Sequence, residues 1–314
     1  MLLVCSKESF ADRSKGDFML TKKQFDLLSE MEHSPSSTQR TLAQKTGMSL
    51  GAVNKISNEL VSLGYCENGT VTKAGLDALE PYRVKRAVIM AAGFGSRLVP
   101  VTLNTPKPLV RVKGKRIIDS LLDAIVGVGI TEIYLVRGYL AEQFDQLLIK
   151  YPTIKFIDNP LYNQANNIAS AMCAREHLQN AYICEADLLL YNPDLIRKYQ
   201  YSTNYLGVPV EESNDWCFIC KDGYISRMVV GGVNCFHMYG ISYWNETDGA
   251  RLAKHIEEAY GFPGGKERYW DQVALDYFID QYKIVVRKCT FDDIVEIDTY
   301  KELCEIDPAY CVNV

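Results

Sequence analysis

The sequence lacks a long apolar segment. Its opening apolar patch, Met1 to Cys5, is followed at once by charged residues, and no later stretch reaches the roughly 20 apolar residues that a membrane-spanning helix needs. A secretory signal peptide also needs a longer apolar core than this patch. We therefore expect a cytoplasmic protein without membrane contact, and a flexible tail over residues 1–18.

An excess of charge and a pattern of paired cysteines are also missing. The net charge is -5 over 314 residues, which gives no bulk attraction to nucleic acid, so any phosphate contact must be local. The ten cysteines are scattered, which is typical of a reducing cytoplasm rather than of a disulfide or zinc scaffold. The close pair Cys217 and Cys220 lies in a strand-like run, and we interpret it as ordinary packing.

The chain divides into two segments with different patterns. Its hydrophobic content of 47% is that of a globular protein, and its length suits one medium domain plus a small one. Residues 19–84 carry apolar side chains at helical spacing, whereas residues 85–314 alternate short apolar runs with helical stretches. We therefore predict a domain boundary near residue 84.

The first segment predicts three helices and a short hairpin. The apolar residues that mark the helices are Phe25, Leu28 and Met31, then Leu42 and Ala43, then Val53, Ile56 and Leu60. The hairpin follows them at Asn68-Gly69, a strong turn signal. This order resembles a winged helix-turn-helix domain, in which the third helix would read the major groove of DNA.

Two interpretations of this segment stay open. In the first it binds DNA through Ser49, Asn54, Lys55 and Asn58, and in the second it is a docking or dimerising module of the same shape. Through residue 85 eleven Lys and Arg stand against ten Asp and Glu, which leaves little charge for neutralising phosphates.

The second segment predicts an α/β fold with a Rossmann-like, mainly parallel sheet. Strands and helices alternate, and ligands on such sheets bind beyond the carboxyl ends of the strands. The expected strands are Ala87 to Met90, Glu132 to Val136, Lys155 to Ile157 and Ala181 to Cys184, and the expected helices are Ile117 to Val128, Ala141 to Lys150 and Ile168 to Leu178.

A glycine-rich loop follows the first of these strands. Glycine lets backbone amides approach a triphosphate closely, and small residues leave room for a base. The expected nucleotide-binding residues here are Ala91, Ala92, Gly93, Phe94, Gly95, Ser96, Arg97 and, further on, Lys107. With Pro100, Thr102 and Thr105 to Pro108, the stretch resembles the signature of sugar-phosphate and choline-phosphate nucleotidyltransferases. We expect Arg97 to bind the pyrophosphate and Lys107 the α-phosphate, where negative charge develops during transfer.

Acidic residues near two strand ends predict a magnesium site. Asp187 follows the strand Ala181 to Cys184, at the strand end where a magnesium ion that bridges two phosphates requires an acid, and it resembles the aspartate of the family's A-D or G-D pair. With Arg97 and Lys107 it makes up the expected catalytic set. For a second ligand the candidates are Asp271, Glu296 and Asp298. We assign Mg²⁺ to Asp187 and Glu296, because Asp298-Thr299 resembles a helix N-cap with Glu302 placed for a capping box, and Asp298 is expected to make that cap.

A second polar segment resembles the N-N-x-x-S stretch that lies near the nucleotide in this family. It consists of Asn166, Asn167 and Ser170. Paired amides can both donate and accept, as recognition of the edge of cytosine requires, but they can equally cap the following helix. Both roles stay open.

The later part of the chain contains candidate residues for binding the acceptor, the molecule that receives the nucleotide. Segments around Trp216, Trp244 and Tyr269 to Asp271 resemble the CTP:phosphocholine cytidylyltransferases of bacterial choline-incorporation pathways, and the resemblance covers residues 86 to 306. It implies transfer of CMP from CTP to phosphocholine, with Trp216, Tyr269 and Asp271 around the quaternary ammonium. Trp244 and Trp270 are expected in the core.

Two further alternatives remain. Glu211, Glu212 and Asp215 would suit an amine-bearing acceptor such as 2-aminoethylphosphonate or phosphoethanolamine, and a sugar 1-phosphate is a third kind of acceptor. A transcriptional regulator that senses a nucleotide or metabolite through a transferase-like domain is the alternative from another functional class.

Overall fold

The computed structural model describes residues 19–311 and divides the chain between Tyr82 and Arg83 into two compact units. The tail expected over residues 1–18 lies outside the described residues. Among the helices of residues 19–311, none combines the length and the apolar character that crossing a bilayer requires.

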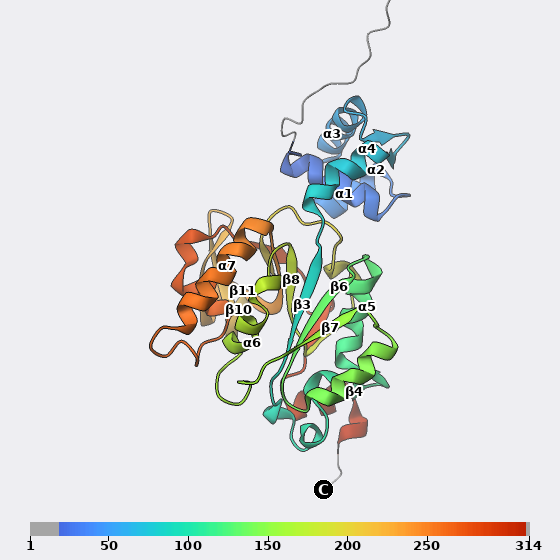
Figure 1. The fold of residues 1–314 in the computed structure, drawn as a ribbon. Coiled ribbons are helices and arrows are strands. Elements are labelled where there is room, and N and C mark those ends of the chain that lie inside the picture. The colour runs from blue at the N-terminus through green and yellow to red at the C-terminus, as the bar shows by residue number, and fades with distance from the viewer. Residues whose placement is uncertain (1–18, 312–314) are drawn as a thin grey trace, which may run out of the picture. The chain divides into compact units, whose positions relative to one another are not determined.

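The first unit is a small helical domain with a short two-stranded wing (Figure 1). Side-chain caps begin its four helices, as shown by Thr38 and Ser49, whose hydroxyls accept from backbone N–H groups in the first turn. Asn68 and Gly69 both have positive φ angles and form the predicted turn. The elements are α1 (Lys22–His33), α2 (Gln39–Thr46), α3 (Leu50–Ser62), β1 (Cys66–Glu67), β2 (Thr70–Val71) and α4 (Lys73–Leu79).

The second unit is built on a seven-stranded sheet with the order β12-β10-β11-β8-β3-β6-β7. Strands β8, β3, β6 and β7 run parallel, and β11 joins β8 antiparallel, so the predicted fold class is confirmed. The bounds are β3 (Arg86–Ala91), β6 (Glu132–Arg137), β7 (Ile154–Asp158), β8 (Ala181–Glu185), β10 (Asn204–Lys221), β11 (Tyr224–Trp244) and β12 (Val285–Lys288).

Helices cover both faces of this sheet, because the strands are apolar on both sides (Figure 1). In β3, Ile89 packs in the cluster that contains residues of α5, whereas Met90 packs with α6 and α7. The helix bounds are α5 (Ile117–Gly127), α6 (Ile168–Cys173), α7 (Glu246–Tyr260) and α8 (Tyr300–Ile306). The helix predicted over Ala141 to Lys150 is a 3-10 helix, Ala141–Ile149, and the one predicted to reach Leu178 ends at Cys173.

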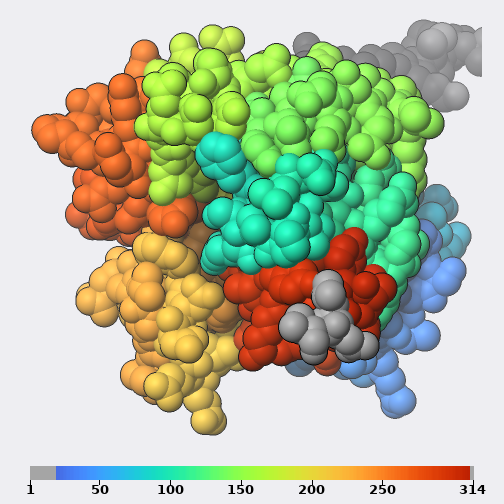
Figure 2. Space-filling view, turned by 90° about the horizontal axis from the view of Figure 1, so that it is seen from below, coloured from blue at the N-terminus to red at the C-terminus, as the bar shows by residue number. Residues whose placement is uncertain are grey.

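Two short pairings complete the unit. The strand β9 (Leu188–Leu190) pairs antiparallel with β13 (Ile294–Glu296), and β4 (Arg111–Val112) pairs with β5 (Lys115–Arg116). Through the first pairing the end of the chain returns to the carboxyl end of β8. In Figure 2 the segment that follows β3 lies against this C-terminal segment, and the hairpin of β10 and β11 lies on the same face.

Candidate active site

The loop after β3 has the backbone that a phosphate-binding turn requires. Gly95 has a φ of 62°, and a Cβ there would lie 2.9 Å from Cβ of Lys107. Both the positive φ angle and the lack of space for a side chain therefore require glycine at this position. The hydroxyl of Thr102 donates to the Gly95 carbonyl and holds the turn. A Cβ at Gly93 would meet no atom of the described chain within 4 Å, so this glycine faces open space.

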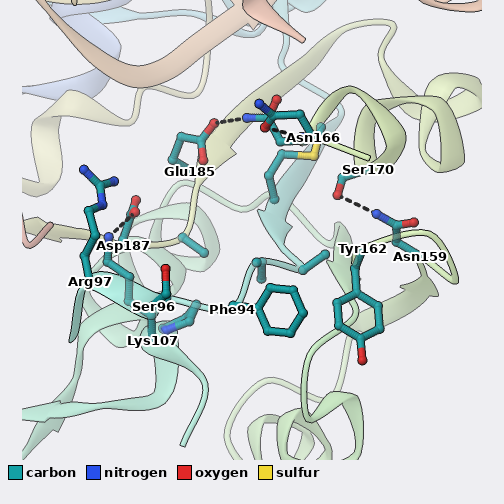
Figure 3. Close-up of a pocket in the computed structure, with 18 of the residues that line it drawn as sticks. Phe94, Ser96, Arg97, Lys107, Asn159, Tyr162, Asn166, Ser170, Glu185 and Asp187 are labelled. Atoms are coloured by element: carbon teal, nitrogen blue, oxygen red, sulfur yellow. Dashed lines mark hydrogen bonds and ion pairs between the residues drawn. The ribbon is translucent and has the colours of Figure 1, made fainter. Parts of the chain in front are cut away.

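A cavity of about 380 Å³ opens beside this loop (Figure 3). The aromatic ring of Phe94 lies at its edge, 5.1 Å from the ring of Tyr139 and 5.3 Å from that of Tyr162. The lining also combines small or apolar residues, such as Ala91 and Ala92, with polar ones, which include Ser96, Asn159, Asn166, Asn167, Ser170, Glu185 and Asp187. Backbone amides, small residues and a flat aromatic edge together suit a nucleotide.

A buried lysine connects this loop to two acids from distant parts of the chain. The Nζ of Lys107 lies 2.6 Å from an oxygen of Asp187 and 3.1 Å from one of Asp298. Burial acts to lower the pKa of Lys107, but the two carboxylates outweigh it and raise the pKa above its ordinary value. The lysine is therefore a fixed positive charge at the floor of the cavity.

Three carboxylates gather at this point. Oxygens of Asp187, Glu296 and Asp298 lie within 4.8 Å of one another. The pairing of β9 with β13 brings Glu296 opposite Leu188, next to Asp187. Burial, followed by the charges of Asp187 and Asp298, raises the pKa of Glu296 well above its usual value.

The donors of this cluster fit a hard divalent cation. The Oδ1 atom of Asp187 is buried and has no hydrogen-bond partner within residues 19–311, although buried carboxylate oxygens are normally paired. Carboxylate oxygens are the ligands that Mg²⁺ prefers. Asp187, Glu296 and Asp298 are thus a suitable set for such an ion.

The expected role of Asp298 as a helix cap is wrong. Thr299 is the N-cap of α8, with its hydroxyl accepting from Glu302 N–H and the Glu302 carboxylate accepting from the Thr299 N–H. The carboxylate of Asp298 points instead to Lys107 and to Arg97, which donates to it through two nitrogens at 2.8 and 2.9 Å. Because Thr299 caps the helix, the carboxylate of Asp298 is available to the acidic cluster.

A second cavity, of about 260 Å³, adjoins the first. Its aromatic wall is formed by Trp216 of β10 and Tyr269, whose rings meet edge to face at 5.9 Å. Beyond them the lining is dominated by carboxylates and two thioethers, those of Glu185, Asp187, Asp215, Asp271, Glu296, Asp298, Met228 and Met238, and it also includes Arg97, Asn167 and Gly240. The cavity is therefore suited to a cation with an apolar surface.

Asp271 is the most buried acid of this second cavity. Only 6% of its surface is exposed, and its carboxylate accepts a hydrogen bond from the Tyr205 hydroxyl. Burial raises the pKa of Asp271 to about 6 in spite of that hydrogen bond, which acts to lower it. A cation bound here would offset the cost of ionising the buried group.

Comparison with known proteins decides the family. Residues 86–206 match the nucleotidyl transferase family. A 2-aminoethylphosphonate cytidylyltransferase from Lancefieldella rimae is 35% identical over 228 residues, which cover 71% of this chain and 92% of that protein. The chain belongs to the nucleotidyl transferase family.

Two further similarities agree with this nucleotidyl transferase assignment. A choline-phosphate cytidylyltransferase from Streptococcus pneumoniae is 32% identical over 226 residues, covering 70% of this chain and 97% of that protein. A solved structure of a CTP:phosphocholine cytidylyltransferase from the same organism superposes with a TM-score of 0.67 at 30% identity, covering 73% of this chain and 100% of the other. Residues 20–65 match a winged helix-turn-helix DNA-binding family. The resemblance predicted from the sequence is therefore confirmed, and the chain is a nucleotidyltransferase with an appended winged helix-turn-helix domain.

The structure gathers the predicted residues into the two cavities. Every predicted nucleotide-binding residue, from Ala91 to Arg97 together with Lys107, Asn166, Asn167 and Ser170, lines the first cavity. Trp216, Tyr269, Asp271 and Glu296 line the second. Of the acids considered for an amine acceptor, Asp215 lines the second cavity, whereas Glu212 lines a separate hollow on the hairpin.

Sequence reasoning missed Glu185, which lines both cavities of the nucleotidyltransferase unit. Glu185 ends β8, and its side chain crosses Gly240 so closely that a Cβ there would collide with it. Burial, then the nearby carboxylates of Asp187 and Asp271, raise the pKa of Glu185 well above its usual value. The signal was available in Glu185-Ala186-Asp187, because residues two apart at a strand end point to the same side.

Asn166 and Asn167 do not serve as the helix cap that one interpretation predicted. Asn167 occupies the N-cap position of α6, but its side chain makes no capping hydrogen bond in the described structure. Ser170 accepts instead from the amide of Asn159.

Proposed function

We propose that the second unit transfers CMP from CTP to phosphocholine and releases pyrophosphate, giving CDP-choline. The observation that supports this reaction is the junction of the two cavities. Asp187 lines both of them, between a glycine loop with Lys107 on one side and the aromatic and acidic wall on the other. The two substrates would meet at this junction.

In this reaction a phosphate oxygen of the acceptor attacks the α-phosphorus of CTP. A new P–O bond forms, the bond to the β-phosphate oxygen breaks, and the electron pair leaves with pyrophosphate. The acceptor phosphate is already ionised at neutral pH, so no covalent enzyme intermediate is required. Lys107 and Arg97 would stabilise the charge on the phosphate oxygens, and the loop amides would orient the triphosphate.

Magnesium is the cofactor that the acidic cluster would hold. Asp187, Glu296 and Asp298 are the proposed ligands, supported by the unpaired Oδ1 of Asp187. When bound, the ion would offset negative charge on the phosphates.

The aromatic wall favours a quaternary ammonium. A trimethylammonium group donates no hydrogen bonds and is held by aromatic faces and nearby carboxylates. Trp216 and Tyr269 supply the faces and Asp271 the charge in this proposal, and the choline-phosphate relative is consistent with it.

A primary ammonium is the second candidate, as in 2-aminoethylphosphonate or phosphoethanolamine. The observation that favours it is the number of carboxylates in the second cavity, where Glu185, Asp215 and Asp271 could each accept a hydrogen bond. A sugar 1-phosphate carries no cation and would leave these acids without a cationic partner.

An assay of pyrophosphate release distinguishes these acceptors. CTP and UTP would each be tested with phosphocholine, phosphoethanolamine, 2-aminoethylphosphonate and glucose 1-phosphate. We expect the highest kcat/KM with CTP and phosphocholine. Faster turnover with a primary amine would replace the proposed acceptor, and turnover only with the sugar phosphate would contradict the whole cationic site.

DNA binding by the first unit is a second function, favoured by its match to a DNA-binding family. Asn54, Lys55 and Asn58 are exposed on α3, whereas the Ser49 hydroxyl is used as the helix cap. Residues 19–82 carry six Lys and Arg against seven Asp and Glu, so affinity would depend on base contacts rather than on charge.

A mobility shift with DNA from upstream of the gene for this protein, at 150 mM salt, tests this function. We expect a specific shift that Asn58→Ala weakens while circular dichroism stays unchanged. Equal affinity for unrelated DNA, or no shift, would favour the docking interpretation.

A further inference from the structure

Asn166 and Asn167 are already engaged by the protein itself. The Nδ2 of Asn166 donates to the carbonyl of Glu267 at 3.1 Å, and its Oδ1 accepts from the N–H of Asn167. The Oδ1 of Asn167 accepts from the Trp270 N–H at 2.9 Å, and its Nδ2 donates to Glu185 at 3.3 Å. Each polar atom of both amides thus has a partner, which reduces what they can offer to a base.

These contacts connect the two cavities. Asn166 lines the nucleotide cavity and Asn167 lines both cavities, whereas the segment that they hold, residues 266–271, supplies Tyr269 and Asp271 to the second cavity. The backbone N–H of Asn166 adds a hydrogen bond to the Lys266 carbonyl at 2.7 Å.

Trp270 and Glu185 complete the connection. Trp270 is 2% exposed, and its indole N–H donates to the same Glu185 oxygen that accepts from Asn167. Its ring stacks on that of Tyr205, whose hydroxyl holds Asp271. A shift of Asn167 would therefore displace Trp270 and, with it, the adjacent residues Tyr269 and Asp271.

We propose that Asn167 is a positioning residue for the acceptor site, acting through Trp270, rather than a reader of the base. Residues 266–271 follow a glycine-containing turn at Gly264 and Gly265, where the chain has little regular structure of its own. Hydrogen bonds to Asn166 and Asn167 therefore fix the conformation of residues 266–271, which the turn alone would not fix. The substrate identities used in the kinetic test rest on the proposed function, but the contacts do not.

The direct test is hydrogen exchange at the Trp270 backbone amide in the full chain without substrates. Removing a hydrogen-bond acceptor of ordinary strength should speed local exchange about 5- to 10-fold, so we expect this effect in Asn167→Ala. Asn167→Asp keeps an oxygen acceptor for the Trp270 N–H but loses the donor to Glu185, so it should retain more of the Trp270 protection than Asn167→Ala does. Asn163→Ala is the matched control, because Asn163 is exposed and contributes to neither cavity among the described residues.

Kinetics then separate positioning from base recognition. We expect Asn167→Ala to raise the acceptor KM about 10-fold while the ratio of kcat/KM for CTP over UTP stays within about 2-fold. Its effect should be less than additive with Tyr269→Ala, because both changes disturb one wall. If Asn167→Ala does not fold, Asn166→Ala, which removes the contact with Glu267, takes its place and should speed exchange at residues 266–271.

Unchanged exchange at Trp270 together with a loss of CTP selectivity would overturn the proposal and make Asn167 a base reader. If no acceptor supports turnover in the wild type, the proposed function fails. The exchange experiment still decides the positioning role, because it needs neither substrate.

Discussion

Lys107 and Asp187 form an ion pair with 2.6 Å between Nζ and the carboxylate, although eighty residues separate them in the chain. Asp298 joins the same lysine from a third region. The cationic and acidic groups that phosphoryl chemistry requires are therefore already in contact within the protein. When a triphosphate and its cation bind, the lysine and the aspartates would exchange contacts with each other for contacts with the ligands. The site would not need to be assembled by a rearrangement of the chain.

The two loop glycines should respond differently to substitution. Gly95→Ala places a Cβ in the left-handed region and against Lys107, so we expect a loss of roughly 1 kcal/mol or more in the free energy of unfolding. Gly93→Ala meets open space in the free protein and should leave stability unchanged while raising the KM for CTP several-fold. Urea unfolding and initial rates measure the two effects. A stability loss in Gly93→Ala with normal CTP kinetics would contradict the placement of the nucleotide.

Asp298 and Thr299 are neighbours with separate roles. Thr299→Ala removes the cap of α8 and should cost about 1 kcal/mol of stability with little change in kcat. Asp298→Asn leaves the cap intact but removes a partner of Lys107 and Arg97, so we expect kcat to fall at least about 100-fold at near-normal stability. Thermal unfolding and pyrophosphate release on both variants check the pair. The reverse pattern would return Asp298 to the role of a cap.

These corrections show what the sequence could and could not predict. The parallel core was predictable, because strands such as Ala87 to Met90 are apolar on both faces. The glycine loop was predictable from its spacing. The long hairpin of β10 and β11 was missed because it mixes charged and apolar residues, and most of its length is not buried.

The convergence of distant groups was harder to infer. That Glu296 approaches Asp187 depends on the three-residue pairing of β9 with β13, which has no distinctive sequence pattern. Asp298 was misassigned because a capping signal lies directly beside it, and sequence alone cannot say which of two adjacent residues makes the cap. Glu185 was overlooked because a single acid at the end of an apolar strand resembles ordinary strand termination.

The buried Asp271 should make stability depend on pH. Its folded pKa of about 6 lies above the ordinary 3.8, so between these values the folded state binds more protons than the unfolded state. The free energy of unfolding should therefore fall as pH rises from about 4 to 6. Asp271→Asn should reduce that slope, as measured by urea unfolding at a series of pH values. Equal slopes in the two proteins would show that Asp271 titrates normally.

Trp216 should contribute more to the binding of a quaternary ammonium acceptor than to the binding of a primary amine acceptor. Trp216→Ala removes one aromatic face, and we expect the KM for phosphocholine to rise about 10-fold, in line with roughly 1–2 kcal/mol for a desolvated cation–π contact. Trp216→Phe keeps a face and should recover most of the loss. Steady-state kinetics with phosphocholine and 2-aminoethylphosphonate measure the effect. An equal loss for both acceptors would mean that Trp216 supports the hairpin rather than the methyl groups.

We propose that Asp187 acts in a CTP-dependent transfer at the junction of the two cavities, and the assay for this role is pyrophosphate release from CTP and phosphocholine with Mg²⁺. Asp187→Asn should lower kcat at least about 1,000-fold with an unchanged circular dichroism spectrum, whereas Asp292→Asn, at an exposed acid outside both cavities of the described chain, should behave like wild type. Turnover by Asp187→Asn at the wild-type rate would contradict the account.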